Sequence, residues 1–264
     1  MNIRMSKSNY LNLCEEIWQN WKDNPNYYKQ DLEGLSEIKF NFCPEPFLFF
    51  KAKSENENPL YFLTYNPGSE MEFQSYQNIK DSKSVVKFEE SYNNNASLLG
   101  RYYDDNLQGK RAHDRINKMY QLAERLNYDC FMQLESMPFH SEKFPSKEKY
   151  IELSNQEGNI ANTYIKHLRE YCLDKDIIAI CAATKQQVNE LNSWTKFMCD
   201  IIGLNLSESK NIVLNNSVNG PTVSCFVDTS NGNLKVLSLV KGNNNLPKIE
   251  TLLNELKVFT QKNI

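Results

Sequence analysis

The sequence has no long hydrophobic run, and no apolar stretch approaches the roughly 20 residues that a membrane-spanning helix needs. Its start, Met1–Arg4, also lacks the apolar region of a secretory signal peptide. Glycine and proline number nine each in 264 residues, and 40% of the chain is hydrophobic, which excludes a collagen-like or disordered protein. These absences predict a globular cytoplasmic protein that has no membrane partner.

Closely spaced cysteine pairs are absent as well. The seven cysteines are an odd number and are widely scattered, without the Cys-x-x-Cys spacing of a zinc site. We therefore expect free, mostly buried thiols, with no metal and no cofactor.

Positive charge is in slight deficit, because 30 lysines and arginines face 33 acidic residues and give a net charge of −3. A general nucleic-acid coat protein is usually strongly basic, so this balance argues against that class. An enzyme that contacts one nucleotide needs only a local basic strip. The sequence has such a strip at Arg101, Lys110, Arg111, Arg115 and Lys118.

Short apolar runs alternate along the chain with segments of helical periodicity. Buried parallel strands are indicated by the runs at 60–65, 130–137, 176–183 and 234–240. Helices are indicated by the spacing of apolar residues over 10–21, 111–126, 159–173 and 246–259, and by a helix start at 185–191. The alternation predicts an α/β fold, a three-layer α/β/α sandwich around a central four-stranded parallel sheet.

Two further segments are rich in residues that favour β-structure. Residues 37–52 contain aromatic residues interrupted by Pro44 and Pro46, which indicates an edge strand or hairpin. Residues 211–240 contain the turn signals Asn219-Gly220-Pro221 and Asn231-Gly232. These turns predict a small antiparallel excursion before the last core strand.

No linker of low-complexity composition interrupts the sequence. We expect one domain over residues 1–264, acting as a monomer and large enough to build its own core. It carries an N-terminal extension at 1–55 and a long polar insert at 69–109. An insert of that length within a compact domain is usually functional.

The carboxyl ends of parallel strands share one edge of the sheet, where open α/β sheets bind ligands. Three polar loops are expected at this edge. Asn66-Pro67-Gly68 follows the first core strand, Pro138-Phe139-His140-Ser141 follows the second, and Lys241-Gly242-Asn243 follows the fourth. Candidate functional residues are therefore sought in these loops.

An apolar strand that ends in Asn66-Pro67-Gly68 resembles the first motif of the uracil-DNA glycosylase superfamily, in particular its mismatch-specific uracil and thymine branch. The order of later features is similar too: an aromatic-rich loop, a basic helix with Arg111 and Arg115, a strand ending in a proline-containing loop, and a last strand-loop-helix segment. The resemblance covers about residues 60–258. It implies a glycosylase-like sheet, DNA (duplex or single-stranded) as the partner, and chemistry without a metal.

The resemblance also implies roles for individual residues. Asn66 would position the water that attacks the sugar carbon, because an amide orients water by hydrogen bonding without carrying a charge. The flipped base would lie against an aromatic side chain, either Tyr76 or its rival Phe73, with Tyr65 and Phe139 as further base-binding candidates.

The last loop departs from the pattern of the family. Where the family usually has a motif that begins with His-Pro-Ser, this chain has Lys241-Gly242-Asn243. Lysine binds phosphate as a point charge, and glycine lets the backbone approach closely. The expected contacts to DNA phosphate are Ser69, Ser141, Lys143, Lys241, Gly242 and Asn243. The departure leaves the excised base open among uracil, mismatched thymine and a bulky modified base.

Two more candidates follow from the residues themselves. His140 lies in the loop after the second strand, where it would stabilise a leaving base. Glu135 interrupts an otherwise apolar strand near its carboxyl end, where a carboxylate is costly unless it is paired or used. We expect both side chains to be catalytic and to converge with Asn66 and Lys241 on one cleft.

The leading hypothesis is a base-flipping DNA glycosylase that acts in base-excision repair or in anti-phage defence. The alternative is a non-catalytic nucleic-acid or nucleotide-binding module with a glycosylase-like fold. A hydrolase that uses Ser69 or Ser141 with His140 is a third class, and the absence of a Gly-x-Ser-x-Gly motif disfavours it.

Overall fold

A computed structural model of the chain describes residues 9–41, 44–50, 59–65, 118–128, 130–141, 145–182, 191–215, 222–240, 254 and 256. Its helices are α1 (Asn9–Asp23), α5 (Lys147–Ser154), α6 (Ile160–Cys172) and α7 (Ser193–Ile202), with a further helical stretch at 118–125. Its strands are β1 (Phe47–Phe50), β2 (Pro59–Thr64), β3 (Cys130–Glu135), β4 (Ile177–Ala182), β5 (Lys210–Asn215), β6 (Thr222–Asp228) and β7 (Lys235–Val240). None of the described helices is both long and apolar enough to cross a membrane.

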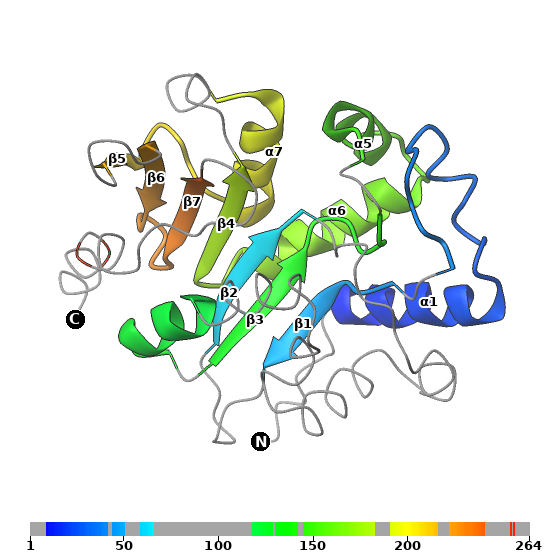
Figure 1. Ribbon diagram of the computed structural model, residues 1–264, viewed down its shortest axis with the longest axis horizontal. Coiled ribbons are helices and arrows are strands. Elements are labelled where there is room, and N and C mark those ends of the chain that lie inside the picture. Colours follow the sequence, from blue (N-terminus) through cyan, green and yellow to red (C-terminus); the bar gives the residue numbers. More distant parts are fainter. Residues whose placement is uncertain are drawn as a thin grey trace, which may run out of the picture.

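All seven of these strands form one sheet in the order β1-β3-β2-β4-β7-β6-β5 (Figure 1). The central neighbours β3, β2, β4 and β7 are parallel, and they are the four strands that the apolar runs predict. β1 adds to β3 antiparallel at one edge, and β6 and β5 continue antiparallel from β7 at the other. The four predicted parallel strands therefore form the centre of the sheet, but the sheet as a whole is mixed and larger than the four-stranded sheet that was predicted.

The extra strands have a physical reason. The outer strands of a parallel core, β3 and β7, would otherwise expose a row of unpaired backbone groups. The edge segment and the antiparallel excursion predicted from the sequence supply partners for these groups within the same sheet.

Side chains alternate between two faces of the sheet, as the period of a strand requires. In β2, Tyr61 and Leu63 pack into one hydrophobic cluster, and Leu60 and Phe62 pack into another. The first side, called here the α6 face, is covered by α1, α5, α6 and α7. The second side, called here the Phe62 face, is covered by the helical stretch at 118–125. Helices therefore lie on both faces of the sheet.

The predicted N-terminal extension takes part in the core. Ile17, Trp18 and Trp21 of α1 are buried in the same cluster as the residues of α6. The Tyr10 ring lies 4.8 Å from the Tyr171 ring, between centroids. Residues 9–23 are therefore a structural part of the domain rather than an appendage.

Two helices begin at side-chain caps. α5 lies in a segment for which the sequence analysis predicted no helix, and it begins where the Ser146 side chain accepts a hydrogen bond from the backbone N–H of Lys149. α7 begins at Ser193, where the Asn192 side chain caps it by accepting from Thr195 N–H at 2.9 Å. Residues 185–190 and most of 246–259 lie outside the described residues.

The amino ends of the central strands are held by buried polar groups. Lys235 Nζ donates to the carbonyl oxygens of Cys172 (2.5 Å) and Lys175 (2.7 Å), at the end of α6. Asp176 accepts from the backbone N–H of Leu234 at 2.6 Å and from the Tyr128 hydroxyl at 2.9 Å. Burial lowers the pKa of Lys235. These contacts join α6, β4 and β7 at the edge opposite the carboxyl ends.

Buried tyrosines predict how stability depends on pH. Burial raises the pKa of Tyr10, Tyr150 and Tyr164 well above the ordinary value of 10.0. Such phenols keep their protons in the folded protein and lose them in the unfolded chain, so their contribution to stability is complete below about pH 10 and is lost above it. We expect the free energy of unfolding, measured with urea, to fall steeply above that pH.

Replacing one of these tyrosines tests the cause. Tyr150→Phe should make the alkaline slope shallower by up to about 1.4 kcal/mol per pH unit, because one proton-linked group is gone. Tyr27→Phe, at an exposed ring, is the control and should leave the slope unchanged. Equal slopes in the wild type and in Tyr150→Phe would contradict the explanation.

Candidate functional site

Two neighbouring strands at the centre of the sheet send the chain to opposite faces. Beyond β2 the chain reaches the helical stretch at 118–125 on the Phe62 face, whereas beyond β4 it reaches α7 on the α6 face. In an open α/β sheet, such a divergence leaves a crevice outside the carboxyl ends of the two strands, and ligands bind there. In Figure 1 the arrowheads of β2 and β4 point toward the side where α5 and α7 lie.

Tyr65, the residue after β2, is held from both ends. Its backbone carbonyl accepts from the Ser136 hydroxyl at 2.7 Å and from the backbone N–H of Met137 at 2.8 Å. Its own hydroxyl donates to the Pro145 carbonyl at 2.8 Å, and its ring is buried. Burial, with Glu148 as a smaller cause, raises the pKa of Tyr65. Tyr65 therefore fixes the point from which the loop after β2 departs, rather than offering an open face to a base.

A lysine lies over two aromatic rings at this point. Lys147 Nζ, at the start of α5, is 5.7 Å from the ring centroid of Tyr65 and 5.5 Å from that of Trp194. The two rings meet edge to face with centroids 4.6 Å apart. These distances are within the range of cation–π attraction. Lys147 is a half-buried residue, and its ammonium group lies over Tyr65, the residue after β2.

A buried polar cluster lies on the other face at the same end. The Glu135 carboxylate accepts from the Thr64 hydroxyl and, at 2.5 Å, from the Gln133 side-chain amide. The same amide donates to Thr64 Oγ1 at 3.2 Å. All three side chains are more than nine-tenths buried. The expectation that a buried Glu135 must be partnered agrees with this arrangement.

His140 belongs to a different cluster. Its Nε2 lies 3.5 Å from Oε2 of Glu45, in the segment before β1, and both side chains are buried. That segment is tied to the His140 loop by backbone hydrogen bonds from Lys39 to His140 and from Glu45 to Pro138. Among the described residues, His140 is thus paired with Glu45, whereas Glu135 is paired with Thr64 and Gln133. The convergence of these two residues with Asn66 and Lys241 on one cleft involves residues outside the described ranges and stays a prediction.

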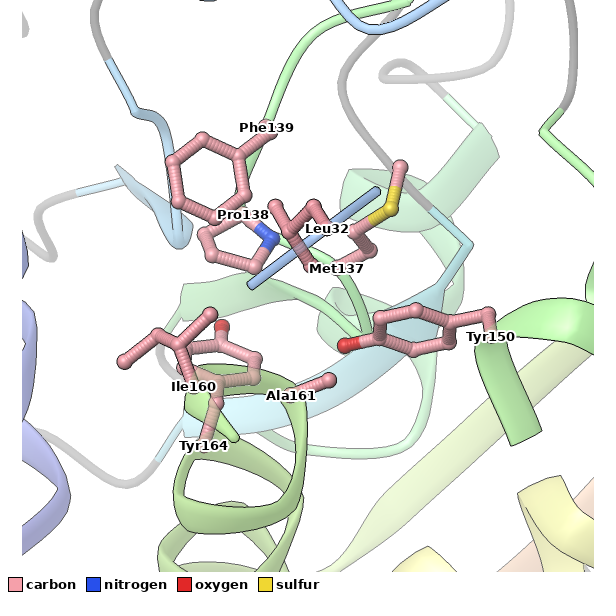
Figure 2. A pocket seen from close by; sticks show the side chains of 8 residues that line it. All are labelled: Leu32, Met137, Pro138, Phe139, Tyr150, Ile160, Ala161 and Tyr164. Carbon is pink, nitrogen blue, oxygen red and sulfur yellow. The ribbon is translucent and has the colours of Figure 1, made fainter. Parts of the chain in front are cut away.

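The remaining described candidates are also buried. Ser141 forms a backbone bridge with Ile38, and the Phe139 ring packs against those of Tyr28 and Phe40. A shallow recess lies beside Phe139, lined by apolar residues such as Ile160 and Ala161 (Figure 2). Its walls converge so closely that they leave no room for a water molecule. Ser141 and Phe139 therefore do not face an open surface.

Several predicted site residues lie outside the described residues. They are Asn66, Ser69, Phe73, Tyr76, Lys143, Lys241, Gly242 and Asn243. Sequence reasoning missed Thr64, Gln133 and Trp194. The sequence could have identified Gln133, because it stands two residues before Glu135 in an apolar strand and so lies on the same face of the sheet.

The described thiols do not suggest nucleophilic chemistry. The five cysteines whose side chains are described are free and buried, as expected from the sequence. Burial raises the pKa of Cys172, Cys199 and Cys225 to about 12, which keeps these thiols protonated at neutral pH. Within the described ranges, no group of three or more histidine, cysteine, aspartate or glutamate side chains is arranged to hold a metal ion.

Comparisons with known proteins add no relative. Neither protein-family models, nor curated proteins, nor solved structures match this chain. Its function must therefore be argued from the site itself.

The hydrogen bonds that hold Tyr65, from Ser136 and Met137 and to Pro145, are called here the clamp on Tyr65, and they predict an effect on stability. Ser136→Ala removes the hydroxyl donor but leaves the Met137 N–H on the same carbonyl, so the free energy of unfolding should fall by about 1 kcal/mol. Urea titration measures the change, and Ser36→Ala, at an exposed serine, should change it by nearly zero. A Ser136→Ala protein as stable as the wild type would show that the hydroxyl does not hold Tyr65.

Proposed function

We propose that the chain is a DNA glycosylase, which flips a base out of DNA and hydrolyses its N-glycosidic bond. The reaction would take place in the crevice outside the carboxyl ends of β2 and β4, called here the switch point. The observation that carries the proposal is the clamp on Tyr65. Tyr65 is held at both ends, and Asn66 is the next residue in the sequence, so the described structure fixes the residue that precedes the proposed catalytic asparagine. A reacting group held in place converts binding energy into rate.

The chemistry suits the residue that follows the clamp. The Asn66 amide would orient a water molecule beneath the sugar carbon, although it is too weakly basic to remove a proton by itself. Catalysis would then come from extruding the base and from stabilising an oxocarbenium-like sugar and a departing base anion. These steps need hydrogen bonds and fixed charges from the protein.

A local positive charge supports contact with DNA despite the net charge of −3. Lys147 stands over Tyr65 and Trp194 beside the switch point, where it would bind a phosphate flanking the flipped nucleotide. Lys149, two residues later, forms an ion pair with Glu152 at 2.7 Å instead. Of these two lysines, Lys147 is therefore the phosphate contact that we propose.

The first test of the proposal is base release. Wild-type protein should release a free base, detected by chromatography and mass spectrometry, from at least one oligonucleotide in a single- and double-stranded set carrying uracil, mismatched thymine or modified bases. Asn66→Ala should slow this release by about 100-fold or more while DNA affinity persists, because it removes water positioning and little phosphate attraction.

A matched asparagine provides the control. Asn231→Ala changes an exposed residue in the turn between β6 and β7, at the amino end of β7, and should release base at the wild-type rate. Base release by Asn66→Ala at the wild-type rate would refute the assigned role of Asn66. DNA binding by the wild type without release of any base would indicate a binding module instead of an enzyme.

The second test concerns Lys147. Lys147→Gln should weaken DNA binding and reduce the slope of log affinity against log salt by about 0.9, because one phosphate contact releases fewer counterions. Lys149→Gln, on the same helix but at an ion-paired residue, should leave the slope close to that of the wild type. Equal slopes for wild type and Lys147→Gln, measured by fluorescence anisotropy, would rule out the proposed phosphate contact.

A further inference from the structure

The cluster of Thr64, Gln133 and Glu135 stands where the lining of the Phe62 face changes from apolar to polar. Thr64 and Glu135 are register partners at the carboxyl ends of β2 and β3. One row nearer the amino ends, Gln133 is the register partner of Phe62, and the same row continues with the buried apolar residues Ile178 and Val236. Thr64 and Glu135 therefore cap a hydrophobic layer at the edge of the sheet where ligands bind, and Gln133 reaches them from within that layer.

The donor hydrogens of this cluster are all used within it. The Gln133 amide has two N–H groups, of which one donates to Glu135 and the other to Thr64. The Thr64 hydroxyl has one hydrogen, which it donates to Glu135. The Glu135 carboxylate has none to give. Any hydrogen-bonding capacity that the cluster offers to another molecule is therefore that of an acceptor.

One acceptor is left over. Gln133 Oε1 is buried and has no hydrogen-bond partner among the described residues. With Glu135 ionised, the amide nitrogen must face the carboxylate, since exchanging the amide oxygen and nitrogen would set two oxygen atoms 2.5 Å apart with no hydrogen between them. A buried acceptor without a donor is costly, so it marks a place that a donor fills when a ligand is bound.

We infer that the Thr64–Gln133–Glu135 cluster recognises the amino-bearing edge of a nucleobase through Gln133 Oε1. This inference rests on the proposed glycosylase function and names the class of base that the enzyme acts on. An exocyclic amino group donates to Oε1 and is attracted by the neighbouring Glu135 carboxylate. A carbonyl oxygen in the same place meets two acceptors and no donor, so uracil-like and thymine-like bases are disfavoured.

Matched base pairs test this preference on the wild-type protein. Cytosine and uracil, 5-hydroxymethylcytosine and 5-hydroxymethyluracil, and adenine and hypoxanthine each differ by replacement of an amino group with a carbonyl oxygen. We expect at least one amino-bearing base to be released about tenfold or more faster than its carbonyl counterpart, since an unmade buried hydrogen bond costs that much. Equal release within every pair, or faster release of the carbonyl members, would overturn the inference and leave the glycosylase function standing.

An isosteric variant then tests the cluster itself. Glu135→Gln replaces an acceptor-only carboxylate with an amide that also donates, so it should reduce or reverse the amino preference. Ser238→Ala, a buried polar residue that contacts Cys225 elsewhere in the sheet, is the control and should keep the wild-type preference. An unchanged preference in folded Glu135→Gln would show that recognition lies elsewhere.

Binding of free nucleosides separates the inference from the proposed function. If the wild type releases no base at all, the glycosylase function fails, and adenosine and inosine are then compared by calorimetric titration. About tenfold tighter binding of adenosine, lost in Glu135→Gln, would support the recognition site without catalysis. Equal affinities, or no binding of either nucleoside, would overturn the inference as well.

Discussion

The parallel pairing of β2 with β3 is the constraint on which both candidate clusters depend. The pairing does not stop at the last strand residues, because Ser136 and Met137 donate backbone hydrogen bonds to Thr64 and Tyr65. Along this register, Tyr65 faces α5 and α7 while Thr64 faces the opposite side with Glu135. A slip of one residue would exchange these faces and would separate Thr64 from Glu135 and Tyr65 from Lys147. One register thus positions the clamp, the cation and the buried acceptor together.

Tyrosine hydroxyls satisfy the backbone where this pairing ends. Carbonyl groups beyond a buried strand have no ladder partner, yet they are shielded from water and need donors. Tyr164 donates to the Glu135 carbonyl at 2.8 Å, Tyr150 to that of Ser136 at 2.7 Å, and Tyr65 to that of Pro145 at 2.8 Å. Each ring contributes apolar area to the core, and each hydroxyl donates a hydrogen bond to a backbone carbonyl. The carbonyl groups at this end of β3 are therefore held by side chains of α5 and α6 as well as by the sheet.

The sequence predicted the parallel centre of the sheet because its strands are buried on both faces and so read as continuous apolar runs. α5 was missed because it has eight residues and only Tyr150, Leu153 and Ser154 are buried, too few to show a helical period. At the site, Glu135 was found because a carboxylate interrupts an apolar strand. The partner of His140 was not, because Glu45 lies far away in the sequence and no local pattern connects them. Tyr65 was expected to bind a base, but burial and a backbone partner make it an anchor.

Lys147 lies at the amino end of α5 and over a residue at the amino end of α7, where helix dipoles disfavour a cation. A cation at the start of a helix is opposed by the positive end of the helix dipole, and Lys147 is the first residue of α5 while Trp194 beneath it belongs to the first turn of α7. Glu148 and the faces of two aromatic rings offset part of this repulsion. An arriving phosphate would offset the remainder, because it adds negative charge where cation and dipoles already converge. In the proposed function, the cation over the rings of Tyr65 and Trp194 would favour one phosphate at the switch point even though the net charge of the protein is −3.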